Sequence, residues 1–220
     1  MRLALFDLDH TLIPFDSGMA WTGFLVGRGV LPPDADELYL SHCRQYVEGR
    51  LDIRALHRAT VAPLGAHPRS TVAAWAAEFE AAVAPRLVPG MQELVRRHRE
   101  AGDLCALVTA TTRFIAEPFG RLFDIRHVLA TESACLATPD GGYSGEIDGE
   151  PCWREHKVAR VHRWLAQAGL RLEDFERSWF YSDSASDLPL LEAVTDPMAV
   201  RPDARLRALA LQRGWRILEA

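Results

Sequence analysis

Residues 3–11 read LALFDLDHT, a short apolar run that breaks abruptly into acidic and polar residues. A run of this kind is typical of a strand that is buried on both faces of a parallel sheet. Two later segments repeat the pattern, because residues 104–108 run into TATT at 109–112 and residues 178–181 run into SDSASD at 182–187. Each predicted strand therefore places small polar or acidic residues at its carboxyl end.

Helical patterns alternate with these strands along most of the chain. They cover residues 91–101, 114–122, 157–168, 188–193 and 204–213, and three of them stop at a glycine, namely Gly102, Gly169 and Gly214. Weaker strand candidates lie at residues 128–130, 198–200 and 215–218. This alternation predicts an α/β fold, with a doubly wound, mostly parallel, Rossmann-like sheet.

Residues 15–85 do not alternate in this way and read as helices only, for instance at 39–49, 53–62 and 71–83. We therefore expect a small all-helical cap domain over residues 15–85, inserted into an α/β core made of residues 1–14 and 86–220. Pro85 and the Pro89-Gly90 pair mark the return to the core. Residues 138–149 contain Pro-Asp-Gly-Gly and a later Asp-Gly, which predicts a β-hairpin standing out of the sheet.

The composition narrows the class of protein. A chain of 220 residues that is 48% hydrophobic and 25% charged is typical of a folded globular protein with a main domain and a smaller insert. A formal net charge of −5 argues against a nucleic-acid-binding surface. The four cysteines form no C-x-x-C pair, which favours a reducing, cytoplasmic location. No stretch approaches the ~18 apolar residues of a membrane span, and no signal-peptide h-region precedes Asp7, so we expect no membrane partner.

Lys157 is the only lysine among the 25 lysine and arginine residues. A lysine that survives in such a composition is a candidate for chemistry that needs a compact ammonium, which a planar guanidinium cannot imitate. The alternative is chance survival on a solvated helix. The composition alone leaves both interpretations open.

Polar residues converge at one edge of the predicted sheet. In an open α/β sheet, ligands bind outside the carboxyl ends of the strands, where the strand order reverses. The residues that we expect at this edge are Asp7, Asp9, Thr109, Lys157, Asp183 and Asp187. Several carboxylates around one ammonium repel each other unless a divalent cation shares the site, and oxygen ligands favour magnesium over zinc. The pattern therefore predicts a Mg²⁺ phosphate site.

Asp7 and Asp9 are two residues apart, so on an extended strand their side chains would share a face. One carboxylate could then attack phosphorus while its neighbour moves protons, and Thr109 and Lys157 could hold the phosphate oxygens. Each piece also has a structural interpretation, since a D-x-D pair often marks a turn and a threonine often caps a helix. Their joint occurrence at strand ends favours phosphoryl-transfer chemistry.

These motifs, taken in order, resemble those of the haloacid dehalogenase superfamily over essentially the whole chain. The matching residues are the Asp7-Leu-Asp-His-Thr11 segment, Thr109, Lys157, and Asp183 with Asp187. A helical cap between the first two motifs and a hairpin before the lysine resemble the phosphoserine phosphatase-like subclass IB, which carries a helical C1 cap. Residues 47–52 and 140–146 also resemble that subclass.

The resemblance implies a magnesium-dependent phosphatase, a phosphoric monoester hydrolase, that acts on a small phosphorylated metabolite. It implies that Asp7 is the nucleophile and that Asp9 is the general acid and later the base. The implied metal ligands are the Asp7 carboxylate, the Asp9 backbone carbonyl and the Asp183 carboxylate, with Asp187 ordering Lys157 and the surroundings of the metal. An aspartate at position 9 also favours phosphate-ester hydrolysis over dehalogenation.

The resemblance also suggests which residues bind substrate. Asp16 lies where phosphoserine phosphatases carry an acidic residue that meets the substrate amine. At the position of their carboxylate-binding arginine this chain has Thr60, and Arg58 is two residues away, about 200° round a helix and on the wrong face. The implied substrate-binding residues are Asp16, Thr109, Ala110 and Lys157.

Further departures concern the phosphate loop, where Ala110-Thr111 replaces the two glycines usual in phosphoserine phosphatases and 182–187 lack glycine. Together the departures weaken phosphoserine as the substrate. They leave a phosphorylated amino alcohol without a carboxylate, such as histidinol phosphate, as a candidate. Aromatic residues of the predicted cap could stack on a substrate ring or belong to its core, and core positions are favoured for Trp21, Phe24, Tyr39, Tyr46 and Trp75.

Two alternatives of a different kind stay open. A phosphotransferase on the same fold would pass the phosphoryl group to an alcohol instead of water. A phospho-accepting signalling module also combines acids, a hydroxyl and a lysine, but such modules place the lysine last, whereas Lys157 precedes the final acids. The sequence does not indicate an oligomeric state.

Overall fold

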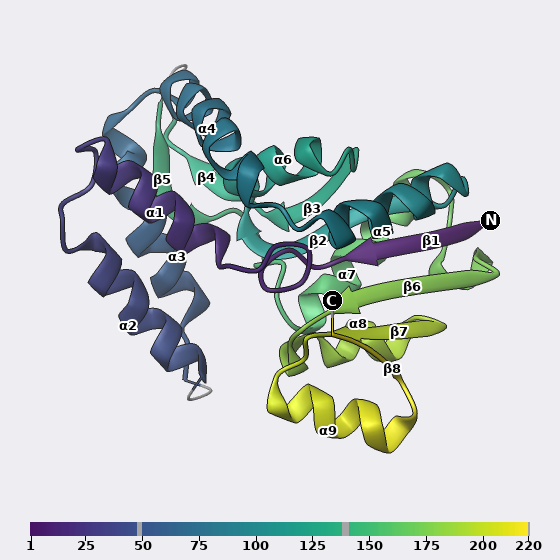
Figure 1. The fold of residues 1–220 in the computed structure, drawn as a ribbon. Coiled ribbons are helices and arrows are strands. Elements are labelled where there is room, and N and C mark those ends of the chain that lie inside the picture. Colours follow the sequence, from purple (N-terminus) through teal and green to yellow (C-terminus); the bar gives the residue numbers. More distant parts are fainter. Residues whose placement is uncertain (48–49, 138–140, 220) are drawn as a thin grey trace.

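The computed structural model describes residues 1–47, 50–137 and 141–219, and in this part of the chain six strands form one parallel sheet (Figure 1). Its order is β3-β2-β1-β6-β7-β8, so the strand order reverses on either side of β1. The strands are β1 (Arg2–Phe6), β2 (Leu104–Thr112), β3 (His127–Thr131), β6 (Arg177–Ser182), β7 (Asp196–Val200) and β8 (Arg216–Leu218). This arrangement confirms the prediction of a doubly wound, parallel α/β sheet.

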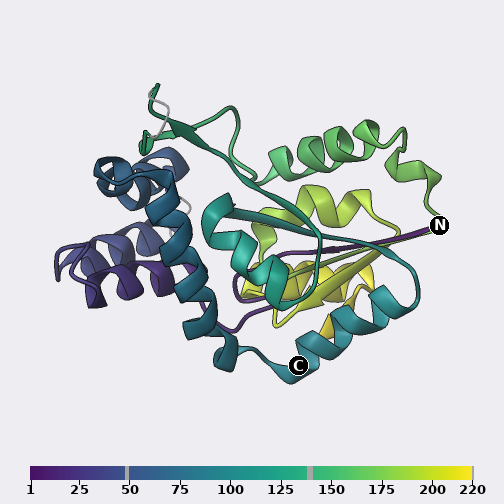
Figure 2. The same cartoon turned by 90° about the horizontal axis from the view of Figure 1, so that it is seen from above.

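Helices cover both faces of this sheet. α5 (Pro89–Glu100) and α6 (Arg113–Leu122) pack on the face to which Phe6 and Leu107 point. The opposite face, formed by residues such as Leu5 and Val108, is covered by α7 (Glu155–Gln167), α8 (Leu188–Ala193) and α9 (Ala204–Arg213). Figure 2 shows α5 and α7 on opposite sides of the strands. Successive side chains of β1 are buried on alternate faces, which explains its uninterrupted apolar run.

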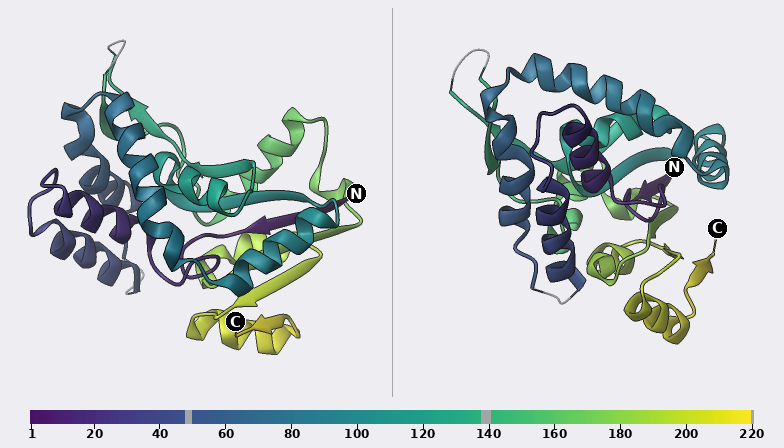
Figure 3. Two further views of the ribbon diagram at one scale, coloured as in Figure 1. Left: turned by 45° about the horizontal axis from the view of Figure 1, so that its top comes forward. Right: turned by 60° about the vertical axis from the view of Figure 1, so that its left-hand side comes forward.

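Four helices lie beyond the carboxyl ends of the strands (Figures 1 and 3). They are α1 (Ser17–Gly27), α2 (Ala35–Val47), α3 (Ile53–Val61) and α4 (Arg69–Val83), with a 3-10 helix at Ala62–Ala66 between the last two. The helical patterns at 39–49, 53–62 and 71–83 correspond to α2, α3 and α4, except that residues 48–49 lie outside the described residues. α1 was not among the predicted helices. Its own apolar and small residues lie on all sides of the helix, so the sequence shows no hydrophobic period on one side.

These four helices do not all have the same relation to the sheet. α1 and α4 share one hydrophobic cluster with α6, since the ring of Trp21 lies 5.7 Å from that of Phe114 and the ring of Phe79 lies 5.9 Å from that of Phe119. The aromatic contacts therefore join part of the expected cap firmly to the α/β core. The boundaries 15–85 stay a prediction, because a continuous cluster crosses them.

A two-stranded antiparallel hairpin stands apart from the main sheet, formed by β4 (Ser133–Cys135) and β5 (Tyr143–Ile147). It begins earlier than the predicted 138–149, and residues 138–140 of that prediction lie outside the described residues. The backbone of Gly142 lies against the backbone after α3, since a Cβ there would come within 2.6 Å of the carbonyl oxygens of Gly65 and His67. The hairpin thus needs a residue without a side chain at this contact.

Two further findings bear on the composition argument. The four cysteines are free thiols, two of which, Cys105 and Cys152, are buried. Among the described helices, none combines the length and the apolar character that crossing a membrane requires.

Candidate active site

Three strands end side by side at the centre of the sheet. Phe6 of β1 pairs with Leu107 of β2 and with Tyr181 of β6, so the residues that follow each of them reach the same edge. The backbone N–H of Asp7 continues the ladder by donating to the carbonyl of Tyr181 at 2.9 Å. A tight turn comes next, in which three N–H groups donate to the carbonyl of Leu8 and His10 adopts a φ of 57°.

Lys157, from the first turn of α7, reaches into this edge and is buried between two carboxylates. Its Nζ donates to Oδ1 of Asp7 at 2.7 Å and to Oδ2 of Asp187 at 2.8 Å. Burial by itself lowers the pKa of Lys157, but the charges of Asp187 and Asp7 outweigh burial and hold the pKa well above its usual value. The lysine is therefore a permanent cation beside Asp7, and the solvated-helix interpretation does not fit its position.

For Asp7, burial has a larger effect on the pKa than the neighbouring charges have. Burial raises its pKa to about 6, with the attraction of Lys157 acting against burial and the charge of Asp187 adding to it. At neutral pH the carboxylate is thus ionised and one of its oxygens is occupied by Lys157.

Asp9 is held by hydrogen-bond donors and by no cation in the described part of the chain. The backbone N–H of Ser17, at the start of α1, donates to its Oδ1 at 2.6 Å, and the Thr111 hydroxyl donates to its Oδ2 at 2.7 Å. Burial, followed by the nearby charge of Asp16, raises the pKa of Asp9 to about 7. A carboxyl group with that pKa can both give and take a proton near neutral pH.

Asp183 follows β6 and faces the turn after β1. The Thr11 hydroxyl lies 3.2 Å from its Oδ1, and the backbone N–H of Asp183 donates to the same hydroxyl at 3.0 Å. Burial, together with the charges of Asp7 and Asp187, raises the pKa of Asp183 to about 8. Three carboxylates therefore destabilise one another's charge here, which is the situation that a bound cation relieves.

The residues at this edge fit a magnesium ion. Oδ1 of Asp187 is buried and accepts no hydrogen bond from the described residues, so the cluster keeps an unused oxygen ligand. No three His, Cys, Asp or Glu side chains of the described chain form a metal-holding group by themselves. The predicted ligands do not need three such side chains, because they are the carboxylates of Asp7 and Asp183 and the backbone carbonyl of Asp9. Its all-oxygen chemistry is the one that Mg²⁺ prefers.

The residues after Val108 continue β2 and do not form the loop that was expected. Threonines are β-branched and suit a strand, and Thr112 pairs with Thr131 after a shift of register. Thr109 is buried at this edge and its Oγ1 accepts the backbone N–H of Thr111 at 3.1 Å. The Ala110 carbonyl accepts the Thr131 hydroxyl at 2.7 Å, which fixes the path of the strand beside Asp7 and Asp9.

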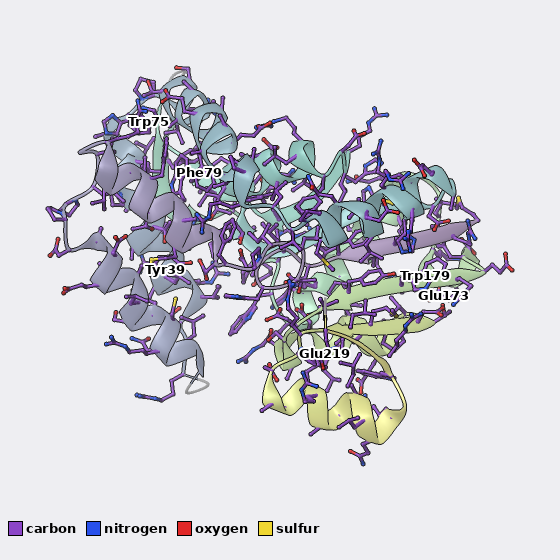
Figure 4. All side chains as sticks on the ribbon, viewed as in Figure 1. Tyr39, Trp75, Phe79, Glu173, Trp179 and Glu219 are labelled. Atoms are coloured by element: carbon purple, nitrogen blue, oxygen red, sulfur yellow. The ribbon has the colours of Figure 1, made fainter. Side chains whose placement is uncertain are left out.

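A cavity of about 570 Å³ opens from these residues towards α2 and α3. All six residues expected at the sheet edge line it, and so do Asp16 and Ala110. Asp16 caps α1, with its Oδ1 accepting the backbone N–H of Met19 and the hydroxyl of Tyr39, both at 2.7 Å. No described residue donates to its other oxygen, Oδ2. Tyr39 comes from α2, among the helices at the left of Figure 4.

The part of the cavity wall that lies away from the carboxylates, towards α3, carries little charge. Thr60 is buried in it, with its hydroxyl donating to the Leu56 carbonyl of its own helix at 2.9 Å. Arg58 points elsewhere, because its guanidinium makes two hydrogen bonds to the Glu146 carboxylate, at 2.8 and 3.1 Å, on the hairpin. Of the described lysines and arginines, only Lys157 lines the cavity.

Sequence reasoning missed several residues that shape the cavity. Ser17 and Thr111 hold Asp9, Tyr39 holds Asp16, and Thr11 holds Asp183. His57 of α3 lies between the hydroxyls of Thr112 and Ser133, at 3.3 and 3.2 Å. Thr11 was inside the D-x-D-x-T motif, and Thr111 and Tyr39 were noted only as a loop residue and an aromatic residue. No sequence signal distinguished Ser17 or His57 from ordinary helix residues.

The aromatic residues of the helical segment divide between two roles. Trp21 is fully buried, Trp75 is 9% exposed, and Phe24 packs on the same cluster, so these three belong to the core, as favoured. Tyr39 differs, because it is buried and also lines the cavity. The side chain of Tyr46 lies outside the described residues.

Comparisons with known proteins agree with this geometry. The model of a family described as haloacid dehalogenase-like hydrolase matches residues 4–192. A histidinol-phosphatase of Neisseria meningitidis is 39% identical, over 99% of this chain and 98% of its own. A phosphoserine phosphatase of Mycobacterium tuberculosis is 31% identical over 97% of this chain and 69% of its own.

Solved structures show the same fold. A protein of unknown function from Bordetella pertussis superposes with a TM-score of 0.90 at 44% identity, covering 99% of this chain and 98% of that one. A phosphoserine phosphatase with bound substrate superposes with a TM-score of 0.67 at 17% identity, covering 99% and 92%. The second likeness concerns the fold alone.

Proposed function

Because the chain belongs to the haloacid dehalogenase-like hydrolases, we propose that it is a magnesium-dependent phosphomonoesterase acting on a small, amine-bearing phosphate ester through an aspartyl-phosphate intermediate. Histidinol phosphate is the first candidate substrate. The Neisseria relative named for that activity matches over nearly its whole length, which supports the choice.

The observation that carries the proposal is the distribution of charge along the cavity. One end holds the carboxylates and Lys157, which suit a metal-bound phosphate. Beyond that end, Asp16 is the only acidic side chain among the described lining residues, and its Oδ2 is free to accept from an ammonium group. The rest of the wall is apolar or neutral, including Leu56, Thr60 and Ile147. A cationic amino alcohol fits such a cavity better than an anion does.

The side chains support a two-step hydrolysis. The carboxylate oxygen of Asp7 attacks phosphorus, the bond from phosphorus to the ester oxygen breaks, and Asp9 protonates the departing alcohol. Asp9, now ionised, takes a proton from water as that water attacks the aspartyl phosphate, which releases orthophosphate and restores Asp7. The pKa of Asp9, raised to about 7, suits both transfers. In this proposal Lys157 and the hydroxyl of Thr109 neutralise and orient the phosphate oxygens.

The carboxylates of Asp7 and Asp183 and the backbone carbonyl of Asp9 would hold the magnesium ion, and Asp187 would keep Lys157 in place. When bound, the ion supplies positive charge that lets an anionic carboxylate approach an anionic ester.

Phosphoserine is the second candidate, since its amine would also meet Asp16. Its carboxylate would enter the neutral wall, where the described lining offers no arginine and Arg58 is bound to Glu146. Burying a carboxylate there without a partner is unfavourable. The neutral wall therefore favours an ester without a carboxylate.

Phosphate release with Mg²⁺, and with EDTA as control, tests the proposal. The panel contains histidinol phosphate, phosphoserine, phosphoethanolamine and p-nitrophenyl phosphate, in which phosphoserine and phosphoethanolamine differ only in the carboxylate. We expect kcat/KM to be highest for histidinol phosphate and higher for phosphoethanolamine than for phosphoserine. Asp16→Asn should lower kcat/KM at least tenfold more for the amines than for p-nitrophenyl phosphate, whose own change measures the effect of losing the Asp16 charge beside Asp9.

A preference for phosphoserine over phosphoethanolamine would contradict the substrate class. Absence of Mg²⁺-dependent release from every ester would contradict the phosphatase itself. Adding an alcohol acceptor separates hydrolysis from transfer, because a phosphotransferase would form a new ester at the expense of orthophosphate.

A further inference from the structure

A second hollow of about 360 Å³ lies outside the catalytic cavity, between the edge strand β3 and helix α7, both labelled in Figure 1. Its described lining carries four arginines and a single carboxylate, from Glu132. We call this hollow the arginine groove; its arginines are Arg113, Arg126, Arg160 and Arg163. The groove has a formal charge of +3 with His127 neutral, on a chain whose net charge is −5.

Two of these arginines have no carboxylate partner. Arg113 is bound to Glu132, with hydrogen bonds of 2.7 and 2.9 Å, and Arg160 lies 3.9 Å from the same carboxylate. No ion pair joins Arg126 or Arg163 to any residue that the structure describes, and both are exposed. Positive charges that gather around a hollow in excess of the carboxylates there are an electrostatic fit for an anion.

The groove also has features of a binding site beyond its charge. The rings of His127 and Trp164 lie 5.1 Å apart and form one aromatic wall. Burial, and next the charge of Arg126, lowers the pKa of His127, in keeping with a positive potential. β3 is an edge strand, so backbone N–H groups on its outer side lack strand partners. A guanidinium fork matches the oxygens of a phosphate group.

We propose that the arginine groove is a second, non-catalytic binding site for a phosphate group, carried either by orthophosphate or by a small phosphate ester. Its volume exceeds what orthophosphate needs and lies within the range of small-ligand pockets.

The groove is lined by residues that are adjacent in sequence to residues of the catalytic cavity. Arg113 and Glu132 directly follow Thr112 and Thr131 in sequence, and both threonines line that cavity. Arg160 is one turn of α7 beyond Lys157. A bound phosphate group would compete with Glu132 for Arg113 and Arg160, and would thus contact the elements that carry the catalytic residues.

Isothermal titration of the metal-free protein in EDTA isolates the arginine groove, because without Mg²⁺ the carboxylates of the catalytic cavity disfavour anions. The probes are orthophosphate and adenosine monophosphate, at constant ionic strength. We expect one site per chain, with the double variant Arg126→Gln/Arg163→Gln weakening binding at least tenfold. The matched control Arg44→Gln/Arg205→Gln removes the same charge from two exposed arginines outside the groove and should leave the affinity unchanged.

Tighter binding of adenosine monophosphate than of orthophosphate would identify an ester as the ligand, and tighter binding of orthophosphate would identify orthophosphate. Equal binding would support a site that recognises the phosphate group alone. Absence of saturable binding, or equal weakening by both double variants, would overturn the proposal. Because the readout is binding without metal, its result is independent of whether the catalytic proposal holds.

Discussion

At the scale of single residues, the site depends on the size of one side chain. Lys157 fills a buried space in which its ammonium contacts Asp7 and Asp187 at hydrogen-bond distance. Its side chain is 3% exposed and that of Asp187 is 2% exposed, so neither can move aside into solvent. All the other lysine or arginine positions of the chain hold arginine. At position 157 a guanidinium would not fit between the two carboxylates.

Lys157→Arg should therefore reduce kcat by about a hundredfold or more, although the charge is conserved. The larger fork would displace Asp7 from its position for attack. Steady-state kinetics with p-nitrophenyl phosphate, together with an unfolding curve, checks this. Asp7→Asn, which removes the nucleophile, serves as the reference for complete loss, and near-normal turnover by Lys157→Arg would contradict the role.

A substitution at Thr60 should change the specificity for substrates that carry a carboxylate. It is buried in the neutral wall of the catalytic cavity, and Thr60→Arg would bring a guanidinium there. We expect the ratio of kcat/KM for phosphoserine to that for phosphoethanolamine to rise about tenfold, which corresponds to ~1.4 kcal/mol of new carboxylate binding. Thr60→Met adds similar length without charge and should not change the ratio; an equal rise in both variants would refute the electrostatic explanation.

At the scale of elements, His57 joins three segments that are far apart in sequence. It lies on α3, and its two ring nitrogens meet Thr112 of β2 and Ser133 of β4. α1 and α4 are joined to α6 by aromatic contacts, and α3 is joined to the hairpin by the ion pair between Arg58 and Glu146.

The His57 contact predicts a pH dependence of stability. Burial lowers the pKa of His57 to about 4, below its unfolded value near 6.5. The unfolded chain therefore binds the proton first, and the contribution of His57 to the free energy of unfolding is complete above pH 6.5 and is lost as the pH falls towards 4. We expect a loss of about 2 kcal/mol over this interval.

Urea unfolding at pH 7 and pH 5 measures this effect. His57→Gln keeps polar atoms between the two hydroxyls but cannot titrate, so its stability should fall less with acid than that of the natural protein. An identical pH dependence in both proteins would show that other groups account for the loss.

At the scale of the whole molecule, the carboxylate cluster costs stability for the sake of function. Asp7, Asp183 and Asp187 come from two distant parts of the chain and are brought together only when β1 and β6 pair. Burial and mutual repulsion raise the pKa of Asp183 to about 8, which means that its ionised form is disfavoured in the folded state at neutral pH. Mg²⁺ binding should offset this cost.

Asp183→Asn should accordingly raise the melting temperature of the metal-free protein by about 3 °C or more, which corresponds to ~1 kcal/mol for a chain of this size. The natural protein should gain thermal stability on addition of Mg²⁺, and the variant should not. Calorimetry in EDTA and in Mg²⁺ tests both parts. A variant that melts at a lower temperature than the natural protein in EDTA would contradict the repulsion argument.

The sequence by itself determined the sheet, the helices that cover it and the set of polar residues at its edge. These follow from local patterns, since an apolar run ending in Asp7 and Asp9 can be read without knowing its neighbours. The helices α2, α3 and α4 were predictable for the same reason. α1 was not, because apolar and small residues lie on both its buried and its exposed side, so its sequence has no one-sided hydrophobic period.

Only the tertiary structure decided which side chains serve the site and which serve the core. Tyr39 and Trp75 are both buried aromatic residues, yet Tyr39 alone holds Asp16 at the cavity. Helix periodicity already placed Arg58 on the wrong face, but only the structure showed that its guanidinium is bound to Glu146. Hydrogen bonds and ion pairs between segments separated by tens of residues depend on packing geometry, and local sequence patterns carry no information about such contacts.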